Sequence, residues 1–277
     1  MVKVGKLPPI APAALQLIRL LGQEESDRSD ILTCLKHDPA LTAGLLRLCN
    51  SAALGLKDPV VSVDQALLLL GHRRLHELVL QVALGDSLSV PLPGYAIEAR
   101  TLWRHSVVTA RIAEQLAERQ PEHGVAPDVA FTAGLLHDVG KLVLADILDP
   151  PRVEAIRCLV HQEDLDRSEA ERRILGVDHA EVGAELLRRW NIPPFLVHAV
   201  QAHHQPCLRC QPPLCSVTHL ADGLAHVLGA NAGWESLATR VNPAAERLWQ
   251  LEATEVEALL LDLAEHLNSL EKTLNPR

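Results

Sequence analysis

Aromatic side chains are scarce in this sequence of 277 residues: they account for 3% of it, with two phenylalanines and one tyrosine. Hydrophobic residues still make up 48% of the chain, so leucine, alanine and valine must form most of the interior. Long alternating runs of β-branched and aromatic residues, which indicate strands, are missing. The length is sufficient for one large domain or two small ones with an ample core. We therefore expect an all-α fold built by helix-on-helix packing.

Several motifs of nucleotide-binding and hydrolytic enzymes are also missing. The sequence has no P-loop, no G-x-G-x-x-G, no H-E-x-x-H and no nucleophile elbow, which argues against the enzyme classes that these motifs mark. It has no basic stripe with interleaved aromatics, and its formal net charge is −9. This charge argues against a nucleic-acid polymer as partner. The charge does not exclude a small phosphorylated ligand that binds through a metal.

The sequence also lacks a long uninterrupted apolar run. No segment approaches the roughly 18 apolar residues of a membrane-spanning helix. The first twelve residues contain prolines where a signal peptide needs an apolar stretch. We therefore expect a cytoplasmic protein that is not bound to a membrane. Its six cysteines are more typical of reduced thiols in that compartment than of a disulfide framework.

One stretch, residues 131–144, stands out because polar residues interrupt an apolar run. It reads F-T-A-G-L-L-H-D-V-G-K-L-V-L, and its apolar residues recur at helical spacing. We expect a largely buried helix that carries His137 and Asp138 in its middle. A buried imidazole and carboxylate need partners, and a divalent cation binds both; an ordinary core histidine is the alternative. Lys141 follows one turn later and could face a phosphate.

Other histidines and one aspartate extend this pair into a candidate metal site. They lie on expected helices or helix ends, and the helices of a bundle can project side chains toward one point. Such a set is large enough for two ions about 3.5–4 Å apart, which can activate a water and clamp a phosphate. Iron, manganese, magnesium, nickel and zinc are all candidate metals, and in an enzyme Asp138 and Lys141 would be the catalytic candidates. The expected ligands are His105, His137, Asp138, His179, His203, His204 and Asp222.

Two further groups could bind metal, although each has a simpler interpretation. His72 and His76 are one helical turn apart, as surface histidines often are without a metal. Cys207, Cys210 and Cys215 lie in a proline-containing loop and could hold a structural zinc, form a redox pair or simply belong to the loop. A closed zinc site needs a fourth ligand, and none is evident in the sequence.

Helix signals divide the chain into two lobes and a tail. Residues 1–85 are expected to form about five short helices with a break at Gly71, and residues 90–94 a proline-containing connector. Residues 243–277 are expected to form an amphipathic helix. There are three alternatives for it: it packs on its own domain, it pairs with a partner, or it leads into a further domain. The second lobe covers residues 96–230. One of its expected helices begins at Pro127 and continues through His137 and Asp138, and another begins at a capping box formed by Ser168 and Glu171. The others are expected at residues 96–118, 178–190, 195–204 and 217–228.

A second set of motifs in the N-terminal half accompanies the histidines and aspartates. They are L-P-P from Leu7, H-D-P-A-L-T from His37, L-L-R-L-C-N-S from Leu45, and S-V-D-Q-A from Ser62 followed by L-L-G ending at Gly71. With the H-A-E-V-G element at His179, they resemble the HDOD (HD-related output domain) family of the HD superfamily over about residues 7–230. The resemblance implies an all-helical bundle, an HDOD domain at residues 1–235, whose N-terminal lobe packs on the HD-type lobe.

The resemblance also implies a bacterial signalling or regulatory output module that binds a protein partner or a small phosphorylated ligand. Its enzymatic relatives, the HD-GYP phosphodiesterases, carry an acidic residue after the double histidine and a G-Y-P element beyond it. Here Gln205 replaces the acid and no G-Y-P follows. We therefore expect metal binding with little hydrolysis of cyclic-di-GMP. A metal-dependent phosphohydrolase or phosphodiesterase acting on a nucleotide, and a scaffold with a vestigial site, are the alternatives.

Overall fold

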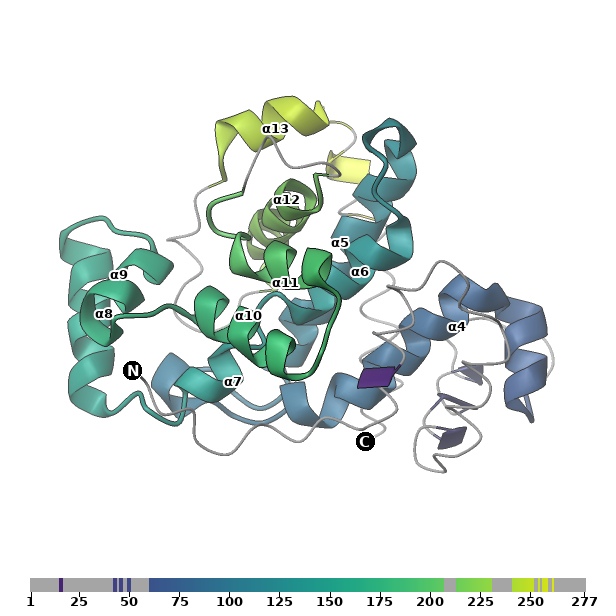
Figure 1. Cartoon of the computed structure of the whole chain (residues 1–277), viewed down its shortest axis with the longest axis horizontal. Helices are drawn as coiled ribbons and strands as arrows, with labels where there is room; N and C mark the ends of the chain where they lie inside the picture. The colour runs from purple at the N-terminus through teal and green to yellow at the C-terminus, as the bar shows by residue number, and fades with distance from the viewer. Residues whose placement is uncertain are drawn as a thin grey trace. The chain divides into compact units, whose positions relative to one another are not determined.

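The computed structural model describes residues 60–206, 213–230 and 241–251, together with residues 15–16, 42–43, 45–46, 49–50, 254, 256–258 and 261. Regular structure in these ranges is helical, which confirms the expected all-α fold (Figure 1). An isolated antiparallel bridge joins Leu92 and Ile97. In chain order the helices are α4 (Val63–Leu88), η1 (Pro93–Tyr95), α5 (Thr101–Arg119), η2 (Pro121–His123), α6 (Pro127–Leu136), α7 (Lys141–Leu144), α8 (Pro150–Gln162), α9 (Arg167–Leu175), α10 (His179–Arg189), α11 (Pro194–Gln201), α12 (Leu214–Val227) and α13 (Pro243–Trp249).

The chain divides into two compact units. One consists of Ile10–Asp86 with Ala253–Arg277, and the other of Met1–Pro9 with Ser87–Glu252. All seven expected metal ligands belong to the second of these, which we call the ligand unit. The packing of the N-terminal lobe on the HD-type lobe stays a prediction. Among the described residues, no helix has the length and apolar character needed to cross a membrane.

Helix α4 begins and bends where the sequence predicts. The Ser62 hydroxyl accepts a hydrogen bond from the Gln65 backbone N–H, and the Gln65 side chain accepts one from the Val61 backbone N–H. These bonds satisfy N–H groups that a helix start leaves without intrahelical partners. Gly71 interrupts the helix with a φ of 74°, a conformation that glycine adopts at little cost.

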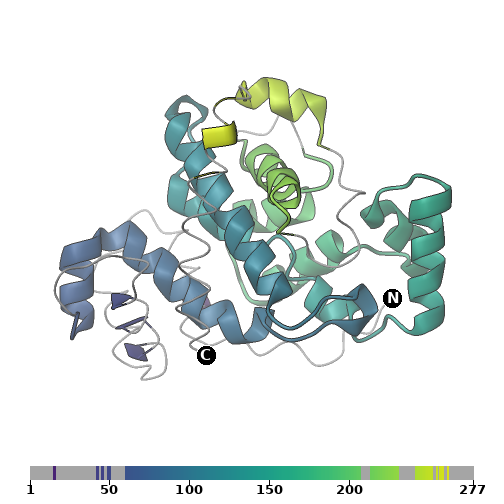
Figure 2. The same cartoon turned by 180° about the vertical axis from the view of Figure 1, so that it is seen from behind.

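The core of the ligand unit forms around α5, α6 and α12. Helix α5 packs along α6, and α12 packs against both, as the two opposite views show (Figures 1 and 2). Gly134 makes the contact between α5 and α6 close, because a Cβ added there would lie 2.7 Å from the Cα of Ala110. The same two helices lead to His105 and His137, so their close packing sets the distance between these two imidazoles.

The remaining helices of the ligand unit surround this core. Helix α10 packs on α11 and α7, α11 packs on α6 and α12, and α8 packs on α9. Proline occupies the first turn of α6, α8, α11 and α13, where its missing N–H costs nothing. Asp149, Asp166 and Asp178 cap α8, α9 and α10 by accepting backbone hydrogen bonds. Short polar residues and prolines therefore fix where each helix begins.

The expected continuous helix through His137 and Asp138 is wrong in one respect. Helix α6 ends at Leu136 and α7 begins at Lys141, so residues 137–140 form a turn between two helices. The apolar residues on both sides of the turn are buried, and their pattern therefore resembles one helix. The turn places the His-Asp pair at helix ends, where its side chains reach toward other elements.

The expected capping box at Ser168 and Glu171 is also wrong. Helix α9 begins two residues earlier, because the side chain of Asp166 accepts a hydrogen bond from the backbone N–H of Glu169. An aspartate is at least as good an N-cap as a serine. Glu171 is consequently buried inside the unit rather than bound to the helix start.

Three other helix boundaries differ from the prediction. Helix α5 begins at Thr101 instead of residue 96, because Ala96 has a φ of 51° and follows η1. Helix α11 ends at Gln201, so the double histidine follows the helix. Helix α13 ends at Trp249, where Gln250 has a φ of 41°. The single helix expected over residues 243–277 is therefore interrupted at this point.

Candidate metal centre

The structure brings all seven expected ligands together in the ligand unit. They form three overlapping groups in which the ligand atoms of each group lie within 4.8 Å of one another. His105 lies on α5, the His-Asp pair in the turn after α6, and Asp222 on α12. His179 is the first residue of α10, and the double histidine follows the C-cap of α11, Ala202. The groups are His105, His137 and Asp222; His137, Asp138 and His203; and His179, His203 and His204.

Two glycines hold the turn of residues 137–140 against the start of α10. A Cβ on Gly140 would lie 1.9 Å from the carbonyl oxygen of His179 and 2.6 Å from the backbone nitrogen of Gly183. Only hydrogen atoms fit between these backbones. This close approach explains the H-x-x-x-G spacing, because Gly183 lies one helical turn after His179 and faces the same turn. It brings His179 to the carboxylate of Asp138.

Asp138 lies between two sets of imidazoles and divides its oxygens between them. Its Oδ2 lies 3.4 Å from His105 Nε2 and 3.3 Å from His137 Nε2. Its Oδ1 lies 3.4 Å from His179 Nε2 and 4.0 Å from His203 Nε2. A carboxylate in this position can bridge two cations, one through each oxygen. We call His105, His137 and Asp222 the first ligand group, and His179, His203 and His204 the second.

The first ligand group is compact and completely buried. Asp222 Oδ1 lies 3.1 Å from His105 Nε2 and 3.5 Å from His137 Nε2. The two imidazole Nε2 atoms are 3.1 Å apart. One carboxylate oxygen and two imidazole nitrogens therefore converge on a single point, which suits a divalent cation of the first transition row.

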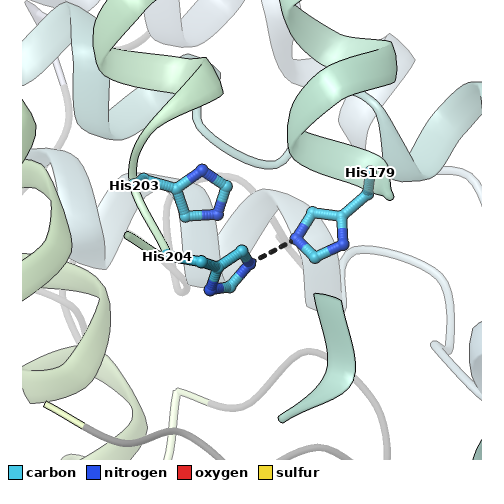
Figure 3. Close-up of side chains that lie close together, drawn as sticks. All are labelled: His179, His203 and His204. Carbon is cyan, nitrogen blue, oxygen red and sulfur yellow. Dashed lines mark hydrogen bonds between the residues drawn. The ribbon is translucent and has the colours of Figure 1, made fainter. Parts of the chain in front are cut away.

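The second ligand group consists of histidines alone (Figure 3). Figure 3 shows His203 and His204 on neighbouring positions facing His179, with the Nε2 atoms of His204 and His179 2.7 Å apart. The rings of His203 and His204 have centroids 4.0 Å apart. His203 and His179 are fully buried, and His204 is the one member of the seven that is partly exposed.

Three of the buried histidines are oriented by backbone carbonyls. The Nδ1–H groups of His105, His137 and His203 donate to the carbonyl oxygens of Ala230, Gly134 and Val200, each at 2.7 Å. A carbonyl oxygen only accepts, so Nδ1 carries the proton in each ring. In the neutral imidazole the lone pair is then on Nε2, and Nε2 is the atom that points into the cluster. Metal-binding histidines are commonly fixed in this way.

Two buried atoms of the cluster have no hydrogen-bond partner: Nε2 of His203 and Oδ1 of Asp222. Leaving buried polar atoms unsatisfied costs about 1–3 kcal/mol each. One of these atoms belongs to each ligand group, so a divalent cation in each group would satisfy both. The donor set and these two atoms fit the expected metal ions.

Lys141 forms an ion pair inside the centre, and its contact with a phosphate stays a prediction. Its side chain is buried, and its Nζ donates to Asp138 Oδ2 at 2.7 Å. Residues three apart on a helix lie on the same face, and the structure uses this spacing for an internal ion pair. Burial alone would raise the pKa of Asp138, but His137 and Lys141 lower that pKa well below its usual range. His137 and Lys141 together therefore keep Asp138 ionised.

Two side chains at the centre were not predicted from the sequence. Glu171 Oε2 accepts hydrogen bonds from the Nδ1 and the backbone N–H of His179, at 2.7 and 2.8 Å. His226 Nε2 lies 3.4 Å from Asp222 Oδ1, one helical turn along α12. The four-residue spacing of the second pair is visible in the sequence and could have identified it. The first pair joins two helices and has no local signal.

The other candidate residues lie apart from this centre or outside the described residues. The side chains of His72 and His76 and all of Cys207 and Cys210 lie outside them. Cys215 is buried at the start of α12, with its Sγ 3.0 Å from Nδ1 of His198. The zinc, redox and loop interpretations of the cysteines stay predictions.

The ionisation of the buried histidines makes the metal-free protein sensitive to acid. Burial, His137 and His179 lower the pKa of His203 from 6.5 to about 3. Between these pH values the unfolded chain binds a proton that the folded chain does not bind. Each unit by which the pH decreases therefore lowers the free energy of unfolding by about 1.4 kcal/mol. His137 acts in the opposite direction: its pKa is raised to about 10, so its contribution is present below pH 6.5 and is lost as pH rises toward 10.

We therefore expect maximal stability of the metal-free protein near neutral pH and a clear loss between pH 6.5 and pH 4. The pKa values of Asp138 and Asp222 are also lowered, and these carboxylates add to the loss below about pH 4. Urea unfolding in the presence of a chelator, at pH 8, 7, 6, 5 and 4, measures it. A free energy of unfolding that stays constant from pH 7 to pH 4 would contradict the expectation.

Comparison with known proteins finds relatives that match parts of the chain. The chain is 26% identical over 202 residues to an uncharacterized protein of Treponema pallidum, covering 73% of this chain and 38% of that protein. It is 36% identical over 101 residues to ribonuclease Y of Opitutus terrae, covering 36% of this chain and 13% of the ribonuclease. The chain thus spans well under half the length of these curated relatives.

Solved structures match over nearly the whole chain. A protein of Shewanella amazonensis SB2B, provisionally described as a phosphohydrolase, is 28% identical with a TM-score of 0.71, covering 99% of this chain and 97% of that one. A protein of Marinobacter aquaeolei VT8, provisionally described as a signal transduction protein, is 25% identical with a TM-score of 0.74, covering 95% and 58%. An HDOD domain protein of unknown function from Geobacter sulfurreducens, 24% identical with a TM-score of 0.74 and covering 98% and 94%, shares the fold.

The family comparison agrees with the motifs and with the fold. The HDOD domain matches residues 7–206, which include six of the seven expected ligands; the seventh, Asp222, follows on α12. The match covers more than half of the chain. This chain belongs to the HDOD domain family.

Proposed function

We propose that this protein is a cytoplasmic regulatory output module of bacterial signal transduction whose HD-type centre binds two divalent metal ions. The position of Asp138 carries the proposal, since its two oxygens face two separate groups of imidazoles. The structural likeness to a protein provisionally described as a signal transduction protein supports the regulatory role. A signalling protein or a small phosphorylated ligand would be the partner.

The ligands fall into two sets that share one residue. His105, His137 and Asp222 would hold one ion, the second ligand group would hold the other, and Asp138 would bind both. Bound ions of this kind supply positive charge for phosphate oxygens and lower the pKa of a coordinated water. The protein contributes imidazoles fixed by backbone carbonyls and a carboxylate that His137 and Lys141 keep ionised. The closeness of the ligand atoms within each group supports this assignment.

Two residues near the centre support binding of a phosphorylated ligand with little hydrolysis. The Nζ of Lys141, a cation at the centre, donates to Asp138. Gln205, which stands where the HD-GYP enzymes resembled by the sequence have an acid, is exposed beside His204. Hydrolysis requires a phosphate held in line with its attacking water, and a neutral amide supplies no charge for that purpose.

Metal-loaded protein is therefore expected to bind cyclic dinucleotides or a generic phosphodiester with little or no hydrolysis. Elemental analysis of protein purified without chelator first establishes the metals present. Product formation from cyclic-di-GMP and bis-p-nitrophenyl phosphate is then compared with the variant H137A/D138A. Turnover that is present in the wild type and absent in the variant would overturn the regulatory proposal in favour of an enzyme.

A metal-dependent phosphohydrolase or phosphodiesterase acting on a nucleotide is the second candidate. The complete ligand set favours it, as do the likeness to a protein provisionally described as a phosphohydrolase and the similarity to ribonuclease Y. Because the ribonuclease similarity covers 101 residues, RNA cleavage should be included in the same turnover assay. Cleavage of a short RNA that requires Asp138 would identify this second candidate as the function.

A further inference from the structure

The two ligand groups differ in charge. The first contains the carboxylate of Asp222, whereas the second contains three histidines and shares only Asp138 with the first. Three neutral imidazoles and one shared carboxylate leave most of the charge of a divalent cation without a nearby anion. A buried cation needs such an anion close by, because its charge is poorly solvated there.

Glu171 provides a carboxylate at this place, in contact with one of the three histidines. Its side chain is fully buried, and its Oε2 accepts from His179 Nδ1 at 2.7 Å. His105, His137 and His203 use backbone carbonyls for the same bond. Among the described ligand histidines, only His179 is paired through Nδ1 with an ionised group. Its Nε2 is on the opposite side of the ring and points to Asp138 and His204.

Arg167 holds Glu171 from the other side. Its Nε donates to Glu171 Oε1 at 2.8 Å, and its guanidinium carbon lies 4.2 Å from the centre of the Tyr95 ring. Both the arginine and the tyrosine are buried. The two oxygens of Glu171 thus have different partners: Oε1 accepts from Arg167 and Oε2 accepts from His179. A side chain fixed at both oxygens has little freedom to rotate.

We propose that Glu171, fixed by Arg167, is a positioning residue that orients His179 and provides the anionic support that the second ligand group lacks. The inference rests on the proposed metal binding and adds a distinction between the two sites. Outer carboxylates that accept a hydrogen bond from a ligand histidine increase its basicity and fix its tautomer. The site of the second ligand group should therefore depend on Glu171, whereas the site of the first should not.

The variant Glu171→Gln tests this dependence, since it keeps the shape of the side chain and removes its charge. Its matched control is Glu169→Gln, which changes a half-exposed glutamate on the same helix, paired with Arg173. Isothermal titration of metal-free protein with Ni²⁺ is expected to show two binding events in the wild type. In Glu171→Gln one event should weaken by about 10- to 100-fold while the other is unchanged, and Glu169→Gln should match the wild type. Glu171→Asp, which restores the charge, should recover part of the lost affinity.

A second measurement does not depend on the metal. Proton NMR of the metal-free protein should show a far-downfield Nδ1–H signal that is lost in His179→Ala, shifts upfield in Glu171→Gln and is unchanged in Glu169→Gln. Two unchanged Ni²⁺ events in Glu171→Gln would overturn the positioning role and leave the proposed metal binding intact. No Ni²⁺ binding by the wild type would overturn both. Equal weakening of both events would show a general structural role and would also overturn the proposal.

Discussion

Replacing Asp138 with asparagine is expected to remove both metal ions at once. Each oxygen of Asp138 faces a different ligand group, so the loss of this carboxylate affects both groups. An amide has one acceptor oxygen and no charge. The loss of affinity should therefore exceed the roughly 100-fold that loss of an outer partner can cause. Elemental analysis of the purified variant should find almost no metal.

The design must separate loss of a ligand from loss of the fold. Asp138→Asn leaves the buried Lys141 without its carboxylate, and an uncompensated buried charge is destabilising. The double variant D138N/K141M removes both charges and should fold more stably than D138N while still lacking metal. Asp146→Asn, at an exposed site just after α7, is the matched control. If D138N retains one ion with wild-type affinity, Asp138 does not bridge two sites.

Replacing Gly140 with alanine is expected to destabilise the ligand unit strongly. Gly140 has ordinary helical dihedral angles, with a φ of −65°, so alanine causes no backbone strain there. The added Cβ would instead overlap the His179 carbonyl and the Gly183 nitrogen, which are backbone atoms that cannot rotate away. We expect a loss of about 3 kcal/mol or more, or about 6–12 °C in the Tm.

Gly183→Ala provides a graded comparison on the other side of the same contact. A Cβ there would lie 3.2 Å from the Gly140 nitrogen and from Cγ1 of Val200, so a small shift can accommodate it. Its effect should be smaller, and thermal unfolding of both variants followed by circular dichroism measures the order. A Gly140→Ala variant as stable as the wild type would show that the turn and α10 can separate freely.

The ligands could be predicted from the sequence because a metal site needs particular residue types in a fixed order. His137, Asp138 and the double histidine are adjacent pairs in apolar surroundings, which makes them visible without a structure. The helical fold was predictable for a related reason, since the core is aliphatic and the helix starts carry prolines and aspartates. These signals involve residues that are close in the chain, so they can be recognised in the sequence without a structure.

Features that depend on contacts between distant elements were missed. The turn at 137–140 arises from the approach of Gly140 to α10, and nothing in the apolar pattern around it distinguishes a turn from a helix. Glu171 follows Ser168 at capping-box spacing, but its partner is a histidine eight residues later. The position of Lys141 in the sequence fits a contact with a phosphate, but its spacing from Asp138 also predicts an ion pair. In each case tertiary packing selected one of two locally equivalent interpretations.

The burial of the ligands also determines how quickly ions exchange. Six of the seven side chains are buried and His204 alone is partly exposed, so an ion reaches the centre past His204 or through a local opening of the helices. Openings of buried regions are rare events. An ion next to Asp222 would therefore leave slowly, even where its equilibrium affinity is modest. The metal content of a purified sample would then reflect which ions were abundant while the chain folded, more than the buffer in which it is measured.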